Sequence, residues 1–278
     1  MTTFIDINLR IAGSPLHVRV GGEGSPLFLL HGGGPGTSGE GWREVMYLLA
    51  PHHRVIAPDY PGFGHSAIPE AAPGIGRLAE LTLELMDTLC IDRAAFAGHS
   101  MGAIVAATVA TRAPQRVTHL ALIAPGGGSY GVKYESQGIA AIARAAQDPT
   151  EANVRAIVEL MSARPELYDA EVKKRMKFLE RPGIVDIQRQ LAAARGDSKA
   201  NAVEPPSALG DKVRGLDIPI ALLWGEHERF NPGEIGPAIH AALPAQASYH
   251  LIPGAGHNVQ YDRAGIVAAT LREFLARK

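Results

Sequence analysis

Apolar and polar residues alternate along the first twenty positions of the chain, and the apolar runs that follow are continuous. Residues 4–11 and 16–20 alternate around a turn-forming stretch at 12–15, which predicts an antiparallel hairpin. The later runs have no alternation, as expected of strands that are covered on both faces of a sheet. We predict these strands at residues 26–30, 54–57, 94–97, 117–124, 218–224 and 248–252.

Segments with helical periodicity separate most of the apolar runs. The predicted helices are residues 42–50, 76–89, 103–113 and 265–275. Strands that alternate with helices favour a mostly parallel sheet flanked by helices. The pattern therefore predicts an α/β fold.

The alternation stops between Gly126 and Asp217. Helical periodicity without a strand pattern is found there at residues 140–146, 152–162 and 170–179. We predict that residues 128–215 form a helical cap over the carboxyl ends of the strands, where it would exclude water and shape a substrate pocket. Residues 1–127 and 216–278 are then the core of the protein.

Composition narrows the class of protein. The length of 278 residues suits one large α/β domain or a domain with an insertion, and 27 basic against 28 acidic residues leave a net charge of -1. This balance argues against nucleic acid or a membrane surface as partner. Cys90 is the single cysteine, so no internal disulfide forms, and its apolar neighbours predict a buried thiol. With no signal peptide or membrane span recognisable, we expect a cytoplasmic protein.

Ser100 is the strongest candidate for a chemical role. It lies in the pattern Gly98-His99-Ser100-Met101-Gly102, between a predicted strand and a predicted helix. A serine in this context occupies a sharp turn that exposes its hydroxyl above the sheet, and the flanking glycines leave room for the strained backbone. We therefore predict that Ser100 is a nucleophile.

A serine hydroxyl needs a base and an acid to become reactive. His257 follows the last predicted strand within Gly254-Ala255-Gly256-His257, and it is the candidate base. Glu228 follows the strand at 218–224 and is the candidate acid, with Glu226 as its competitor. The chain order Ser100, Glu228, His257 is that of nucleophile, acid and histidine in α/β-hydrolases.

An oxyanion hole requires two backbone N–H groups near the nucleophile. We predict that Met101 supplies one and that Gly33, in the glycine-rich loop at 31–36, supplies the other. The positions expected to line the substrate site are Gly32, Gly34, His99 and Asn258.

No cofactor or metal is expected. The loop at 31–36 lacks the lysine and hydroxyl residue of a phosphate-binding loop. His227 and Glu228 resemble the start of H-E-x-x-H, but Asn231 occupies the position of the second histidine. A small-molecule substrate is the expected partner.

The chain resembles the α/β-hydrolase superfamily over its whole length. The motifs that carry the resemblance occur in order, namely HGGGPG at 31–36, DYPGFGHS at 59–66, GHSMG at 98–102, WGEHERF at 224–230 and GAGH at 254–257. Within the superfamily the chain is most similar to the meta-cleavage product hydrolases, which cleave a carbon–carbon bond in vinylogous 1,5-diketones. This resemblance implies that Arg175 binds substrate and that the protein forms a homodimer.

The chain departs from that subfamily in positions that handle the dienol substrate. His99 stands where the subfamily has Asn, and Asn258 stands where it has Trp. The region around Arg43 and Glu44 also lacks the subfamily's Asn. A carboxylesterase or lactonase is therefore the alternative within the same class. A lyase or cofactor-free oxygenase on this fold is a more remote one, because function resides in the site and not in the fold.

Overall fold

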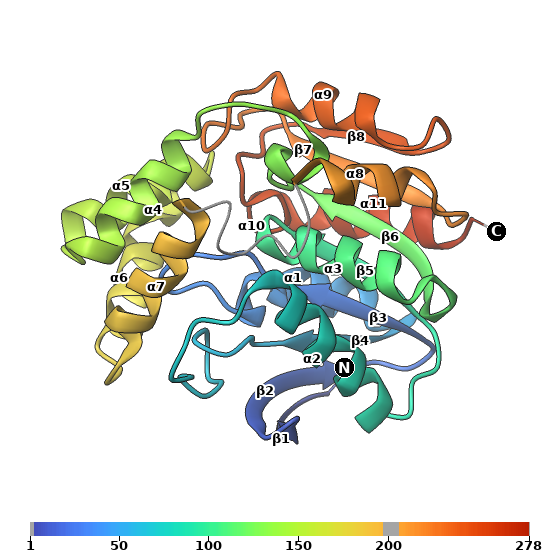
Figure 1. The fold of residues 1–278 in the computed structure, drawn as a ribbon, viewed down its shortest axis with the longest axis horizontal. Helices are drawn as coiled ribbons and strands as arrows, with labels where there is room; N and C mark the ends of the chain where they lie inside the picture. The colour runs from blue at the N-terminus through green and yellow to red at the C-terminus, as the bar shows by residue number, and fades with distance from the viewer. Residues whose placement is uncertain (1–2, 197–205, 278) are drawn as a thin grey trace.

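An eight-stranded sheet forms the centre of the protein in the computed structural model, which describes residues 3–196 and 206–277 (Figure 1). The strand order is β1-β2-β4-β3-β5-β6-β7-β8. The strands are β1 (Phe4–Ile11), β2 (Ser14–Gly21), β3 (Ser25–Leu30), β4 (His53–Pro58), β5 (Ala94–His99), β6 (Val117–Ile123), β7 (Ile220–Gly225) and β8 (Ser248–Ile252). Strands β3 to β8 pair in parallel, and β1 and β2 form the predicted antiparallel hairpin, so the predicted α/β class is confirmed.

Helices cover both faces of this sheet. On one face lie α2 (Ile75–Thr88), α3 (Met101–Arg112) and α8 (Pro206–Arg214), with α3 packed against the other two (Figure 1). On the other face lie α1 (Arg43–Leu49) and α11 (Ala264–Leu275), which pack against each other. Parallel strands with helices on both faces read as continuous apolar runs, which explains the lack of alternation in their sequences.

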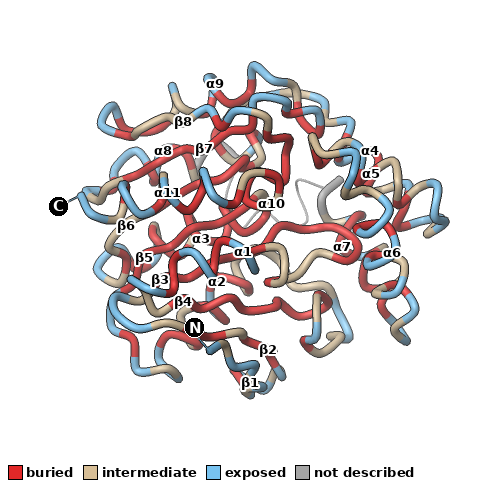
Figure 2. Tube along the Cα trace, turned by 180° about the vertical axis from the view of Figure 1, so that it is seen from behind, coloured by how far each residue is buried: buried red, intermediate tan, exposed pale blue. Residues whose placement is uncertain are grey.

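The central strands are buried along their whole length. Every residue of β5 and β7 is buried, and Figure 2 shows the same for the middle of the sheet. The rings of Phe28 on β3 and Phe96 on β5 stack with their centroids 5.1 Å apart. Burying each such side chain stabilises the fold by about 1.5–3 kcal/mol relative to leaving it exposed.

A separate group of helices lies beyond the carboxyl ends of the parallel strands. We call it the helical layer; it consists of α4 (Gln137–Gln147), α5 (Glu151–Met161), α6 (Tyr168–Leu179) and α7 (Ile184–Gly196) (Figure 1). Three of these four helices overlap predicted segments. Helix α8, which the sequence analysis placed within the cap at 128–215, packs against α3. The division of the chain into core and cap stays a prediction.

Several elements escaped the sequence analysis. Helices α7 and α8 were not predicted, nor were α9 (Ile235–Ala242) and α10 (Val259–Asp262). The predicted burial of Cys90 is wrong, because its side chain is exposed. Cys90 has a φ of 55° and lies two residues after the end of α2, directly after the C-cap Leu89. The chain leaves the helix there, so the apolar face that buries Leu85 and Met86 does not include the thiol.

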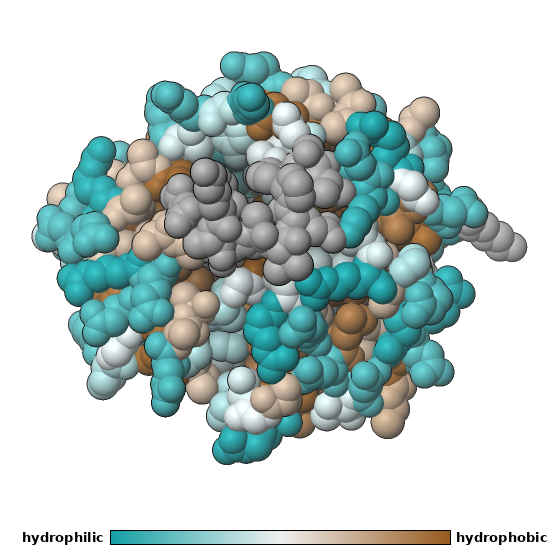
Figure 3. Space-filling model, viewed as in Figure 1, coloured by the Kyte–Doolittle hydropathy of each residue, from teal (hydrophilic) through white to brown (hydrophobic). Residues whose placement is uncertain are grey.

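The surface shown in Figure 3 is mostly polar, with apolar side chains in small scattered patches. Among the described residues, no helix combines the length and apolar character that crossing a membrane requires.

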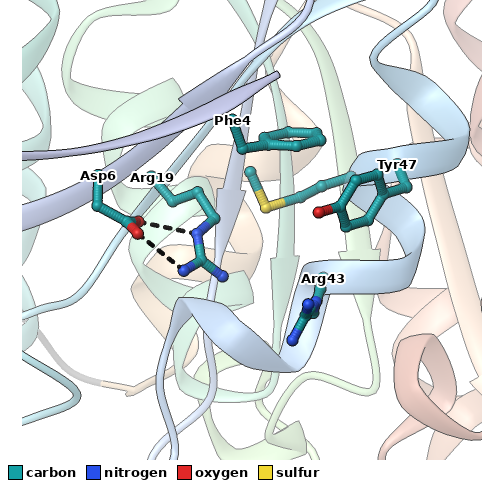
Figure 4. Close-up of a pocket in the computed structure, with 6 residues that line it drawn as sticks. Phe4, Asp6, Arg19, Arg43 and Tyr47 are labelled. Atoms are coloured by element: carbon teal, nitrogen blue, oxygen red, sulfur yellow. Dashed lines mark hydrogen bonds and ion pairs between the residues drawn. The ribbon is translucent and has the colours of Figure 1, made fainter. Parts of the chain in front are cut away.

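A shallow pocket beside the hairpin holds a charged cluster and none of the predicted site residues (Figure 4). The guanidinium of Arg19 donates from Nε and Nη2 to the carboxylate of Asp6, at 2.8 and 3.0 Å. The ring of Tyr47 lies edge-on to Phe4, with centroids 4.7 Å apart. These contacts fasten β1, the edge strand, to β2 and α1.

Candidate active site

Ser100 lies on a strained turn between β5 and α3. Its φ of 51° and ψ of -113° fall in a backbone region that residues other than glycine rarely adopt, and this conformation costs about 1–3 kcal/mol. Its backbone N–H donates to the carbonyl oxygen of Ile123 at 2.8 Å, which fixes the turn against the end of β6. The hydrogen bond to β6 therefore stabilises the strained backbone conformation of Ser100.

Two glycines make this turn sterically possible. A Cβ on Gly98 would lie 2.2 Å from the carbonyl oxygen of Gly102. A Cβ on Gly102 would lie 2.3 Å from the carbonyl oxygen of Leu30, at the end of β3. The missing side chains let the turn close on itself and bring it against the strand from which the loop at 31–36 begins.

His257 and Glu228 meet in the loops that follow β8 and β7. Nδ1 of His257 lies 2.7 Å from Oε2 of Glu228, and both side chains are almost fully buried. Oε1 of Glu228 accepts from the backbone N–H groups of Phe230 and Asn231, at 2.7 and 3.0 Å. Both carboxylate oxygens are thus hydrogen-bonded, as a buried carboxylate requires.

The tautomer of His257 follows from this contact. Since a carboxylate only accepts, Nδ1 carries a proton, and in the neutral form of the ring Nε2 then has a free lone pair. Nε2 is buried and has no hydrogen-bond partner among the described residues. A neutral imidazole with an unoccupied Nε2 is what a general base needs.

Glu226, the competing acid, points elsewhere. Its Oε2 accepts from the backbone N–H of Gly254 at 2.8 Å, and its side chain is about half exposed. Of the two candidate carboxylates, Glu228 is the one that contacts the imidazole of His257.

The glycine-rich loop lies against Ser100, as predicted. A Cβ on Gly32 would lie 2.8 Å from Nδ1 of His99 and 3.4 Å from Cβ of Ser100. Gly34 has a φ of 112° and lies near Ile142 of α4, which places this part of the loop under the helical layer. Gly33 is buried between them. The roles of Gly33 and Met101 as oxyanion donors stay predictions.

His31 fixes the start of this loop. Its Nδ1 donates to the carbonyl oxygen of Gly32 at 2.6 Å, and its Nε2 accepts from the backbone N–H of Tyr60 at 3.0 Å. Because Nε2 must accept, the ring is neutral, and burial lowers the pKa of His31 in agreement.

His99 contacts both the predicted nucleophile and the predicted base. Its Nε2 donates to the carbonyl oxygen of His257 at 2.9 Å, and the two rings lie edge to face with centroids 5.0 Å apart. Burial lowers the pKa of His99 well below its usual value. His99 is therefore neutral at pH 7.

Four of the predicted substrate-binding residues line one small cavity. It has a volume of about 30 Å³, and these four are Gly32, His99, Arg175 and Asn258. The structure thus brings the predicted residues together, and their roles toward substrate stay predictions.

Arg175 is already bound to protein groups. It is 1% exposed, and its Nε donates to Oε1 of Glu171 and its Nη1 to the carbonyl oxygen of Pro35, both at 2.8 Å. Burial raises the pKa of Glu171, but Arg175 and Lys174 outweigh it and leave the pKa lowered. Arg175 therefore ties α6 to the glycine-rich loop.

Sequence reasoning missed two residues that shape the site. The carboxylate of Asp262 accepts from the Ser162 hydroxyl at 2.5 Å, from the Ala163 N–H at 2.9 Å and from the Gly256 N–H at 2.8 Å. It thereby joins the loop of His257 to the end of α5. The signal available in the sequence was an acidic residue five positions after His257. The second residue, Phe230, was quoted as part of a motif but given no role.

The protein-family comparison decides the identity of this arrangement. The family described as alpha/beta hydrolase fold matches residues 26–264, which is most of the chain. The chain belongs to the α/β-hydrolase family. It is an enzyme of that family, and its sheet, strained serine turn and flanking helices have the order that the fold requires.

Named relatives of this α/β-hydrolase include other hydrolases. 2-Hydroxymuconate semialdehyde hydrolase of Pseudomonas sp. (strain CF600) is 29% identical over 95% of the chain and 92% of its own length. The solved structure of 2-hydroxy-6-oxo-6-phenylhexa-2,4-dienoate hydrolase from Rhodococcus sp. strain RHA1 superimposes with a TM-score of 0.89 over 100% of both chains, at 24% identity.

A third relative of the α/β-hydrolase is larger. The dihydrolipoyllysine-residue acetyltransferase component of an acetoin cleaving system from Pseudomonas putida is 36% identical over 93% of the chain. The chain spans 66% of the length of that protein.

The buried neutral His31 predicts a loss of stability in mild acid. Below about pH 6.5 the unfolded chain takes up a proton at His31 that the native protein does not bind. The free energy of unfolding therefore decreases as the pH is lowered, until the pH reaches the lowered pKa of native His31. His31→Gln keeps an amide that donates and accepts, and it should flatten this decline in urea unfolding between pH 7.5 and 5.5. His227→Gln, at an exposed position, is the control. An unchanged slope in His31→Gln would contradict the assignment.

The buried Arg175–Glu171 pair leads us to expect that loss of Arg175 lowers stability, which loss of a residue that only binds substrate would not do. Arg175→Met leaves a buried carboxylate with one partner fewer and should lower the free energy of unfolding by about 3–5 kcal/mol. The double change with Glu171→Gln should recover most of the loss. Lys174→Met removes an exposed partner of Glu171 and should cost less than about 1 kcal/mol. A single Arg175 variant of normal stability and raised KM would indicate a substrate ligand instead.

Proposed function

We propose that this protein is a cofactor-independent serine hydrolase that uses Ser100, His257 and Glu228 on a small, partly apolar carbonyl substrate. The observation that carries the proposal is the buried His257–Glu228 hydrogen bond of 2.7 Å. Nε2 of the same imidazole has no hydrogen-bond partner among the described residues, and the imidazole contacts the ring of His99, the chain neighbour of the strained Ser100. The narrower form of the proposal is cleavage of a carbon–carbon bond in a dienoate diketone, and the named relatives support it.

In the first half-reaction the hydroxyl oxygen of Ser100 attacks the substrate carbonyl carbon, and Nε2 of His257 takes the hydroxyl proton. The carbonyl oxygen becomes an oxyanion, for which the N–H groups of Met101 and Gly33 are the proposed donors. Glu228 stabilises the imidazolium. The tetrahedral intermediate then breaks the bond to the leaving group, which receives the proton from His257.

In the second half-reaction water replaces the leaving group. His257 removes a proton from water, the hydroxide attacks the acyl carbon, and the proton returns to the oxygen of Ser100 as the acid leaves. For a carbon–carbon bond the leaving group is a carbanion that a second, conjugated carbonyl delocalises. For an ester or lactone it is an alkoxide. The same residues serve both reactions.

We propose that the helical layer acts as the cap of this site. Contacts between it and the core surround the predicted machinery: Arg175 with Pro35, Asn258 with Met161, and Gly138 with Phe230. Such a layer excludes water and strengthens electrostatic interactions at the reacting carbonyl.

An esterase or lactonase is the second candidate. His99 and Asn258 stand where the carbon–carbon hydrolases have Asn and Trp, and both line the cavity next to Gly32 and Arg175. These two replacements are the observation that favours the second candidate. The substrate chemistry at that cavity decides between the two reactions.

Substitutions at the proposed triad should separate Glu228 from its competitor. Ser100→Ala should abolish turnover and covalent labelling by a fluorophosphonate, and Glu228→Gln should lower kcat by about three to four orders of magnitude because the imidazolium loses its carboxylate. Glu226→Gln should retain the wild-type rate. Labelling is read by intact-protein mass spectrometry. Activity retained in Ser100→Ala would remove the serine nucleophile from the mechanism.

A substrate panel tests the reaction class. We expect the dienoate diketone to be cleaved with a larger kcat/KM than p-nitrophenyl acetate or γ-butyrolactone, measured at one pH and protein concentration. Rapid turnover of the ester or lactone without any cleavage of the dienoate would reject the narrower proposal and favour the second candidate.

A further inference from the structure

Phe230 forms the stacking surface of the proposed base. Its ring lies parallel to the imidazole of His257, with an angle of 14° between the planes and 4.2 Å between the centroids. Phe230 is 3% exposed, and its backbone N–H donates to the carboxylate that holds Nδ1 of the same imidazole. One residue thus contacts both His257 and Glu228.

The same ring belongs to the apolar cluster of the helical layer. It packs with Ile142 of α4 and with Ile157 and Met161 of α5, although its own position is in the loop after β7. A Cβ on Gly138 of α4 would lie 2.0 Å from the ring, so helix and ring are in direct contact.

The backbone repeats this connection. The carbonyl oxygen of Phe230 accepts from the N–H of Gly138 at 2.9 Å and from the hydroxyl of Ser136, the residue that caps α4, at 2.7 Å. The beginning of α4 is therefore anchored on the residue that stacks against His257.

We propose that Phe230 is a positioning residue that holds the imidazole of His257 in the orientation needed for catalysis. Through Phe230, this orientation depends on how α4 packs against the loop after β7. The inference rests on the proposed function, because it concerns the base of that reaction. Because the two rings stack in parallel at 4.2 Å, the Phe230 ring blocks rotation of the imidazole out of its observed plane. Its face also favours the imidazolium that forms when the proton moves.

The other groups near the imidazole do not replace this surface. Glu228 contacts its Nδ1 edge, and the neutral ring of His99 lies edge-on at 5.0 Å. Asp262 is hydrogen-bonded to the loop backbone at Gly256, and the charge of Arg175 is paired with Glu171. Among the described residues, Phe230 is the ring that stacks face to face with His257.

The test compares Phe230→Leu with Phe230→Tyr and with Phe274→Leu. Phe274 is another buried phenylalanine, on α11, where its ring contacts His119. The readout is the rate of fluorophosphonate labelling at Ser100 as a function of pH. Phe230→Leu should slow labelling about 10- to 100-fold, and the acidic limb of the profile should move down by roughly half a pH unit. Phe230→Tyr should restore both, and Phe274→Leu should change neither while losing similar thermal stability.

Gly138→Ala tests the coupling to α4. The new methyl group pushes on the ring and should slow labelling, whereas the combination with Phe230→Leu should cost less than the sum of the single changes. Gly128→Ala, where a Cβ meets no atom within 4 Å, is the control.

Each failure has its own signature. If the wild type is not labelled, or if Ser100→Ala is labelled equally, the proposed function fails. If the wild type is labelled and Phe230→Leu matches it in rate and pH profile, Phe230 has no positioning role. If Phe230→Leu and Phe274→Leu slow labelling equally and the acidic limb of the profile does not move, the role of Phe230 is limited to packing.

Discussion

The close approach of the turn at Ser100 to the end of β3 is the constraint on which the site depends. Gly102 allows contact with the carbonyl oxygen of Leu30, and the glycine-rich loop starts one residue later. Because parallel strands deliver their carboxyl ends to one edge, the loops after β3, β5, β7 and β8 converge there. A side chain at Gly98 or Gly102 would separate the strained serine from its neighbours.

Convergence of loops also buries polar groups, and hydrogen bonds to the helical layer satisfy several of them. Asp262 joins the His257 loop to the end of α5, and Arg175 joins the glycine-rich loop to α6. An unpaired group in any of these places would cost about 1–3 kcal/mol or more. The layer therefore contributes hydrogen bonds that the loops cannot provide for themselves.

The sequence predicted the sheet well because two-sided burial leaves a strong local signal. Each predicted strand from 26–30 to 248–252 overlaps an observed strand, and the Ser100 turn was evident from its flanking glycines. Choosing Glu228 over Glu226 agreed with the contact to His257 because the turn after β7 places the later carboxylate inward.

Contacts between residues far apart in the chain could not be predicted from the sequence. Arg175 and Glu171 sit four residues apart on a helix that looks like a charged, solvated face, with Lys173, Lys174 and Lys177 nearby. Only the docking of α6 on Pro35 buries the pair. Phe230 is likewise an ordinary apolar residue until α4 and His257 are placed on either side of it.

Under the proposed function, the contacts of His99 would limit the groups that a substrate can place beside it. Its Nε2–H is committed to the carbonyl oxygen of His257, and burial lowers its pKa, so the remaining ring nitrogen, Nδ1, is an acceptor. An asparagine amide at this position would present both a donor and an acceptor. The neutral ring presents its acceptor next to Gly32 and Ser100, and a carboxylate or enolate oxygen placed there would meet a lone pair. Under the proposed function, a substrate group that carries a proton, such as a hydroxyl or an enol, would be the complementary partner for Nδ1 of His99.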